Sequence, residues 1–235
     1  TGGFTDCLLQ FGARRVYAVE PDDAIEVARE QARANGFAER IQFMQNLSTV
    51  VTLPEPADVI VSDLRGVLPP FENHLPAIID ARQRHLAADG LLIPQQDSLW
   101  AALVDAPELY QRHLAGCDAP FNGLSLAAAR RIVVNSWRKA RFKPEQLLVE
   151  PRCWTTIDYR EIITPQLSGE LAWTALSPGI GHGLSLWFDS ILAPGVTLSN
   201  APAAPELIYG SAFFPWLAPV TLSAGDRVTV KLKAT

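Results

Sequence analysis

A change of sequence pattern at Pro94 constrains the fold more than any other feature of the chain. Residues 1–94 alternate short apolar runs with amphipathic helical segments, which is typical of a parallel, doubly wound sheet with helices on both faces. Beyond Pro94, short strand-like runs separated by Pro, Gly, Ser and Asn predict an antiparallel β-barrel or sandwich. We therefore expect an α/β domain over residues 1–94 and a β domain over residues 95–235.

Periodicity and end signals locate the elements of the first domain. Asp22 and Asp23 supply a cap and negative charge before a helix, and Asn35-Gly36 supplies its left-handed stop. The run from Asp58 to Asp63 is continuous and apolar, so we expect a strand buried on both faces. The full set comprises strands at 16–20, 41–45, 58–63 and 91–93, with a second helix at 75–86.

Short β-rich runs of similar length predict the strands of the second domain. These runs are 99–104, 154–163, 184–191, 212–216 and 227–232. Residues 121–142 break the pattern, because apolar residues mix there with arginines, and we expect a partly helical excursion from the barrel.

Composition excludes several classes of protein. The chain has 20 Lys and Arg against 25 Asp and Glu, with no basic run, so nucleic acid is an unlikely partner. Its 3 cysteines and 4 histidines show no metal-ligand spacing, so we predict no metal site and no disulfide framework. No apolar stretch approaches the roughly 20 residues that a membrane span needs. We expect a reduced, cytoplasmic protein that does not enter the membrane.

Two features of the first domain suggest a nucleotide cofactor. Residues Thr1, Gly2 and Gly3 precede a helix that ends near Gly12, and such a loop turns main-chain amides toward a ligand. Glu20 ends the strand at 16–20, which we take as the second strand of the domain, and there doubly wound folds hold ribose hydroxyls with an acidic residue. Each feature also has a purely structural interpretation, since glycine often begins helices and glutamate is common at strand ends.

A second pair of acidic residues lies in the loop after the strand at 58–63. Ligands of open α/β sheets bind at the carboxyl ends of strands, which favours Asp63 as a site residue. Gly66 and two prolines predict a folded-back loop that brings Glu72 toward the same pocket. Two carboxylates can form bidentate hydrogen bonds to a guanidinium. The alternative is that both are solvated loop acids.

The order of these segments resembles the protein arginine N-methyltransferases across essentially the whole chain. Five stretches carry the resemblance: Gly12 to Glu20 with the ribose-binding Glu, Asp58 to Glu72 with the double-glutamate loop, Leu86 to Pro94 leading into the barrel, Gly183 to Asp226 in the barrel, and 121–142 at the dimerisation arm. The resemblance implies a class I, Rossmann-like methyltransferase domain and a homodimer that methylates a protein or peptide.

The resemblance also implies the site residues. Asp63 and Glu72 would hold the acceptor nitrogen, whereas S-adenosyl-L-methionine would lie against a set comprising Thr1, Gly2, Glu20, Ser48, Thr49 and His74. The glycine loop stands at residues 1–3, so we expect the first strand of the domain to be missing from this sequence.

Departures from the family pattern keep other functions open. Asp63 replaces a glutamate, Thr49 falls near the usual adenine-binding acid, and Leu207-Ile208-Tyr209 stands where the family has Thr-His-Trp. These changes suggest a non-catalytic dimeric scaffold as the alternative. Residues 1–19 also resemble haemolysin-like ribosomal RNA methyltransferases, but those enzymes are expected to use a catalytic lysine, and no lysine precedes Lys139.

Overall fold

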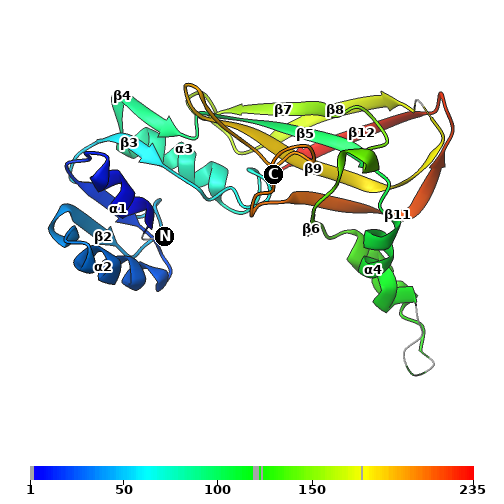
Figure 1. The fold of residues 1–235 in the computed structure, drawn as a ribbon, viewed down its shortest axis with the longest axis horizontal. Helices are drawn as coiled ribbons and strands as arrows, with labels where there is room; N and C mark the ends of the chain where they lie inside the picture. The colour runs from blue at the N-terminus through cyan, green and yellow to red at the C-terminus, as the bar shows by residue number, and fades with distance from the viewer. Residues whose placement is uncertain (1–2, 119–121, 123, 176) are drawn as a thin grey trace. The chain divides into compact units, whose positions relative to one another are not determined.

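The computed structural model describes residues 3–118, 122, 124–175 and 177–235 (Figure 1). The chain forms two compact units, Thr1–Ile60 with Ala77–Leu91 and Val61–Pro76 with Leu92–Thr235, which are described separately here. Residues 61–76, which the expected boundary at Pro94 assigns to the first domain, cluster with the second unit. This placement matters because the loop carrying Asp63 and Glu72 belongs to the β unit.

The elements up to Pro94 follow the predicted alternation of strand and helix. In chain order they are α1 (Gly3–Gln10), β1 (Val16–Val19), α2 (Ala24–Ala34), the short 3-10 helix η1 (Ala38–Arg40), β2 (Ile41–Met44), β3 (Ala57–Val61), α3 (His74–His85) and β4 (Leu86–Ile93). The helix predicted at 75–86 is therefore one residue displaced, and the last strand begins five residues earlier than its predicted start at Leu91.

Hydrogen bonds join the four strands in pairs. β1 runs parallel to β2 with Val16 opposite Ile41, and β3 pairs with β4. Within the described residues these two pairs form separate two-stranded sheets.

One prediction about β3 is wrong. We expect the run at 58–63 to be buried on both faces, yet Val59 is 46% and Val61 is 39% exposed. Residues two positions apart on a strand project from the same face, so the face that carries Val59 and Val61 is only partly covered.

α2 forms for the reasons read from the sequence. Ile25, Ala28 and Ala32 recur at helical spacing and are buried, and Gly36 after the helix has a positive φ of 75°. Asp22, rather than Asp23, accepts a hydrogen bond from the Ala24 amide, at 3.0 Å.

Strands of the second unit form two antiparallel sheets. The larger has the order β6-β11-β9-β5-β7 with β10 on β9, and the smaller pairs β12 with β8. The bounds are β5 (Gln96–Val104), β6 (Arg138–Ala140), β7 (Arg152–Asp158), β8 (Leu167–Thr174), β9 (Gly179–Ala193), β10 (Val196–Ser199), β11 (Ser211–Leu222) and β12 (Arg227–Ala234). The predicted antiparallel β structure is confirmed.

A helical excursion leaves this unit earlier than predicted. It contains α4 (Pro107–Asp118), the 3-10 helix η2 (Ala127–Ala129) and α5 (Arg130–Val134), and a further 3-10 turn, η3 (Pro144–Gln146), precedes β7. Tyr110 and Leu114 of α4 are buried against Val104 and Phe213, which anchors the excursion to the sheet. Residues 119–121 and 123 of this region lie outside the described residues. None of the helices in the described part of the chain has the length and apolar character needed to cross a membrane.

Candidate functional site

The loop after β3 is hydrogen-bonded at its start and turns sharply a few residues later. The amide of Ser62 donates to the carbonyl of Ile93 at 2.9 Å, and Gly66 turns the chain with a φ of 55°. Val67 and Leu68 are then buried. The loop is consequently packed into the β unit, which holds Asp63 and its neighbours in place.

Arg65 is a buried cation at the centre of this loop. Its Nη1 donates to Ser190 Oγ at 2.7 Å and to Asp97 Oδ1 at 3.3 Å, and its Nη2 lies 3.4 Å from Asp63 Oδ1. The guanidinium carbon also lies 5.3 Å from the centre of the Phe188 ring. A buried charge is tolerated only when it is paired and hydrogen-bonded, and these contacts supply that pairing.

A chain of hydrogen bonds continues from Asp97 into the core. Tyr159 donates its hydroxyl proton to Asp97 Oδ2 at 2.6 Å, so its oxygen accepts from Nε2 of His74 at 2.9 Å. Burial lowers the pKa of His74 to about 4, with the charge of Arg65 acting in the same direction. Burial likewise raises the pKa of Asp97, against the opposing effect of Arg65. His74 is thus a neutral donor, and its buried Nδ1 has no hydrogen-bond partner among the described residues.

Tyr209 makes the most informative contact of the predicted site. Its hydroxyl lies 2.8 Å from Oδ1 and 2.7 Å from Oδ2 of Asp63. Burial, followed by the Asp63 hydrogen bond, raises the pKa of Tyr209 to about 12, so the phenol stays protonated near neutral pH. Sequence reasoning noted the missing histidine at residues 207–209 and overlooked the hydroxyl. The tyrosine at the position of a family pocket loop was the available signal.

Glu72 lies in the turn that precedes α3 and is exposed. Its φ of 56° is unusual for a residue with a side chain. The turn is held by the Phe71 amide, which donates to Leu68 O at 3.0 Å, and by the Phe71 ring, whose centre lies 4.7 Å from that of Trp137. Within the described residues, no hydrogen bond to the Glu72 carboxylate is found. That Glu72 and Asp63 face one acceptor stays a prediction.

In the first unit, Glu20 stands directly after β1, as predicted. Its amide donates to Met44 O at 3.2 Å, and its Oε1 accepts from the Asp22 amide at 3.1 Å. The second carboxylate oxygen has no donor in the described part of the chain. The carboxylate is therefore oriented by the main chain while one oxygen stays open to a ligand.

Ser48 and Thr49 lie in a tight turn that one arginine holds. The amides of Val50 and Val51 donate to Leu47 O, at 3.0 and 3.2 Å. Arg84 of α3 donates to the carbonyls of Ser48 and Val51, both at 2.8 Å. Asp80 pairs with the same guanidinium at 2.7 Å and raises the pKa of Arg84. The sequence analysis did not identify Arg84.

The other predicted cofactor residues are placed only in part. Thr1 and Gly2 lie outside the described residues, although α1 begins directly after them at Gly3. His74 belongs to the second unit, where its Nε2 bonds to Tyr159. Its predicted contact with the cofactor stays a prediction.

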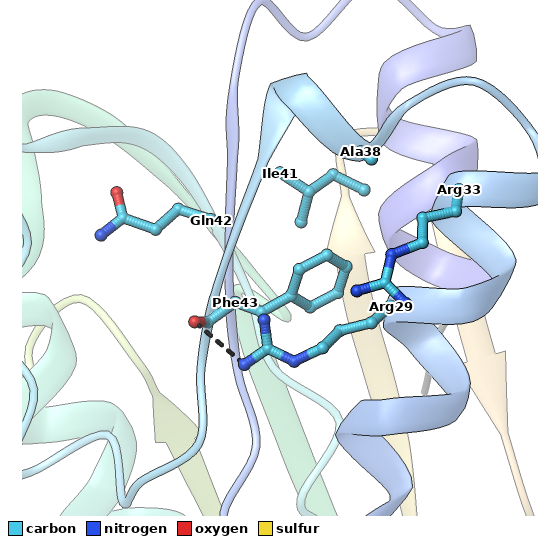
Figure 2. A pocket seen from close by; sticks show the side chains of 6 residues that line it. All are labelled: Arg29, Arg33, Ala38, Ile41, Gln42 and Phe43. Carbon is cyan, nitrogen blue, oxygen red and sulfur yellow. Dashed lines mark hydrogen bonds between the residues drawn. The ribbon is translucent and has the colours of Figure 1, made fainter.

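A pocket in the first unit lies apart from all the predicted residues. Figure 2 shows its lining, formed by Arg29, Arg33, Ala38, Ile41, Gln42 and Phe43. Arg29 Nε forms an ion pair with Glu26 Oε1 at 3.1 Å, and its guanidinium carbon lies 5.0 Å from the centre of the Phe43 ring. The pocket offers no arrangement of acids or nucleophiles for catalysis.

Comparison with known proteins gives these residues a context. Protein arginine N-methyltransferase 2 of Mus musculus is 28% identical over 229 residues, which cover 92% of this chain and 51% of that protein. Arginine N(omega)-methyltransferase of Streptomyces achromogenes subsp. streptozoticus is 27% identical over 231 residues, 94% of this chain and 62% of that protein. The chain resembles the arginine methyltransferases. The resemblance predicted from the motifs is confirmed.

The resemblance covers part of each relative. The chain spans about half the length of the mouse methyltransferase, 51%. No protein-family model matches the chain.

A solved structure confirms the fold class. The Trypanosoma brucei PRMT1 enzyme-prozyme heterotetrameric complex with AdoHcy matches with a TM-score of 0.86 at 22% identity, covering 97% of this chain and 75% of that one. An α/β domain followed by a β domain is thus the fold of this chain.

Proposed function

We propose that the protein carrying this chain is an S-adenosyl-L-methionine-dependent methyltransferase that methylates a nitrogen, with an arginine guanidinium of a protein as the first acceptor to test. The likeness to arginine methyltransferases over more than nine-tenths of the chain carries the proposal. The acidic loop of Asp63 and Glu72 supports it, because carboxylates are the groups that bind a guanidinium.

The residues of the first unit fit a nucleoside cofactor. Glu20 keeps one oxygen open beside the end of β1 and would bind the ribose hydroxyls. Ser48 and Thr49, in a turn fixed by Arg84, would contact the adenine through hydroxyl and main-chain groups. Bound S-adenosyl-L-methionine supplies a methyl group on a positively charged sulfur. Thr1 and Gly2 would lie against its methionine portion.

The second unit would hold the acceptor. Glu72 would accept hydrogen bonds from the acceptor's N–H groups and so orient the nitrogen that is methylated. Asp63 offers a second carboxylate, already contacted by Arg65 and Tyr209. Little acid or base chemistry is needed, so these residues act by positioning and electrostatics.

A homodimer with a protein or peptide substrate completes the proposal. The excursion around α5 exposes a group of large apolar side chains, Leu124 at 68%, Leu126 at 38% and Ile132 at 76%. Exposed apolar groups of this kind mark protein contacts. The solved neighbour is itself a heterotetrameric complex.

Glu72→Gln tests the catalytic assignment. The substitution keeps the shape but removes the charge, so we expect kcat for methylation of an arginine peptide to fall about 10²-fold or more. Affinity for S-adenosyl-L-methionine, measured by calorimetry, should be retained. Glu161→Gln, at another exposed acid of the same unit, is the matched control. Unchanged turnover in Glu72→Gln would contradict the proposal.

A non-catalytic dimeric scaffold is the second candidate. The contacts of Arg65 and Tyr209 with Asp63 favour it, because they engage one of the two predicted acceptor-binding groups without a substrate. Calorimetric titration with S-adenosyl-L-methionine separates the two functions. Micromolar binding supports the enzyme, whereas absence of heat from the folded protein supports the scaffold.

A further inference from the structure

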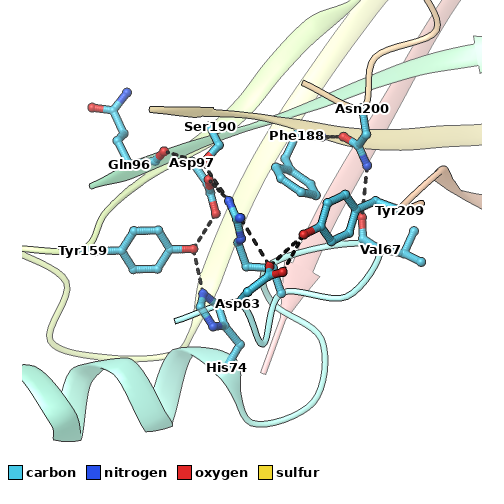
Figure 3. A network of polar contacts seen from close by, with 11 residues as sticks. Asp63, Val67, His74, Gln96, Asp97, Tyr159, Phe188, Ser190, Asn200 and Tyr209 are labelled. Atoms are coloured by element: carbon cyan, nitrogen blue, oxygen red, sulfur yellow. Dashed lines mark hydrogen bonds and ion pairs between the residues drawn. The ribbon is translucent and has the colours of Figure 1, made fainter. Parts of the chain in front are cut away.

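The hydroxyl of Tyr209 lies between the two oxygens of Asp63. The two separations, 2.8 and 2.7 Å, are nearly equal, so the phenol is shared by the whole carboxylate (Figure 3). A guanidinium that binds a carboxylate end-on places one N–H opposite each oxygen. The hydroxyl occupies the space between those two N–H groups, and the two modes of binding Asp63 exclude each other.

Arg65 occupies a further hydrogen-bond acceptor position of the Asp63 carboxylate. Its Nη2 approaches Oδ1 at 3.4 Å, while its Nη1 is engaged by Asp97 and Ser190. A carboxylate has about four lone-pair positions. Tyr209 occupies one of these positions on each oxygen, and Arg65 occupies a third. An incoming guanidinium can therefore form only one hydrogen bond to Asp63, unless the phenol moves.

The loop bearing Tyr209 is held on both sides, so the phenol is in place without any ligand. Arg141 Nη2 donates to Leu207 O at 2.8 Å, and Lys139 Nζ donates to Ile208 O. On the other side, Asn200 Nδ2 donates to Gly210 O. These contacts fix the main chain on both sides of Tyr209.

The ring of Tyr209 has its own support, independent of the hydroxyl. It meets the ring of Phe188 edge to face, with centres 5.8 Å apart and planes at 69°. A phenylalanine at this position keeps that contact and loses only the hydrogen bonds to Asp63.

We propose that Tyr209 determines acceptor specificity by competing with a guanidinium for the carboxylate of Asp63. The proposal deepens the proposed function and rests on it for the identity of the acceptor. It implies that the wild-type site binds a guanidinium weakly, and that removing one hydroxyl opens Asp63 to a bidentate contact.

The test measures binding of a short peptide with one arginine to the protein carrying this chain, by calorimetry. Tyr209→Phe should bind the peptide about tenfold more tightly than wild type, since hydrogen bonds to charged groups have about this effect. Asp63→Asn should remove the gain when combined with Tyr209→Phe. A peptide with citrulline in place of arginine, similar in shape but neutral, should gain less from Tyr209→Phe than the arginine peptide does.

Tyr17→Phe provides a matched control. Tyr17 also donates to a carboxylate, Glu55 Oε1 at 2.9 Å, but in the first unit. This variant should leave peptide affinity unchanged. If Tyr209→Phe binds the peptide no more tightly than wild type does, or if neither protein binds it detectably, the proposed competition for Asp63 is wrong.

Methyl transfer is measured separately on the same proteins. A tighter arginine peptide complex without methyl transfer would support competition and overturn the proposed methyltransferase function. Methyl transfer without any gain in affinity would support that function and overturn competition.

Discussion

Arg65 and Asp97 form an ion pair from which water is excluded. Nη1 of Arg65 lies 3.3 Å from Oδ1 of Asp97, and the two side chains are 4% and 0% exposed. The pair joins the loop after β3 to β5, which explains why residues 61–76 belong to the β unit. The same pair places a guanidinium beside Asp63, so the charge of this site is partly balanced within the chain.

Arg65→Met should destabilise the second unit strongly. The methionine fills similar space but leaves Asp97 buried without its cation, and breaking such a pair costs about 3–5 kcal/mol. Equilibrium denaturation in urea measures the loss. The double variant Arg65→Met with Asp97→Asn should recover part of it, because the buried charge is gone. If the single and double variants lose equal free energy, the pairing is not the source of the loss.

Stability should fall on acidification because His74 is buried in its neutral form. Its pKa is lowered to about 4, below the unfolded value near 6.5, so the unfolded state binds the proton first. The contribution of His74 to the free energy of unfolding is fully present above pH ~6.5. It is lost as the pH falls toward ~4, and the free energy of unfolding decreases by about 3 kcal/mol in total.

His74→Gln isolates this effect from other titrating groups. Glutamine can still donate to Tyr159 but does not titrate, so denaturation midpoints of the variant should depend less on pH between ~6.5 and ~4 than those of wild type. Parallel pH profiles for the two proteins would show that His74 does not contribute. His113→Gln serves as a comparison, at a half-buried histidine whose pKa is lowered by partial burial and by the charge of Arg138.

The sequence predicted local structure well because periodicity and end signals are local. α2 with its glycine stop and the placement of Glu20 after β1 both follow from a few adjacent residues. The pairing of strands into two separate sheets, and the exposure of Val59, depend on which neighbours are present and are not encoded in the strand itself.

The partners within the candidate site were beyond sequence reasoning for the same physical reason. Tyr209 contacts Asp63 across 146 positions, and Ser190 contacts Arg65 across 125. Nothing in the local pattern selects these pairs. Arg65 itself could have been suspected, since a cation next to Asp63 in an apolar loop needs a partner once that loop is buried.

Arg84→Lys should weaken binding of S-adenosyl-L-methionine if the turn of Ser48 and Thr49 contacts the cofactor. Lysine keeps the charge but cannot hold two carbonyls and Asp80 with one planar group. We expect a loss of affinity of about tenfold in calorimetry, which corresponds to roughly 1.4 kcal/mol.

Arg29→Lys is the control for Arg84→Lys. Arg29 also pairs with a helix acid, Glu26, and reaches a carbonyl, Phe43 O, in the same unit. It holds no predicted cofactor residue, so affinity should be unchanged. Equal losses in both variants would point to general destabilisation of the unit, and no loss in Arg84→Lys would remove its positioning role.

Ile132→Asp tests whether the helical excursion forms the dimer. Ile132 of α5 is 76% exposed, so the substitution costs the fold little while placing a charge in the proposed interface. Light scattering during size-exclusion chromatography should show a shift from dimer to monomer at micromolar concentration. Ile163→Asp, at a residue 78% exposed in the same unit but outside the excursion, should leave the dimer intact. A dimer that survives Ile132→Asp would place the interface elsewhere, because burying an unpaired carboxylate is strongly unfavourable.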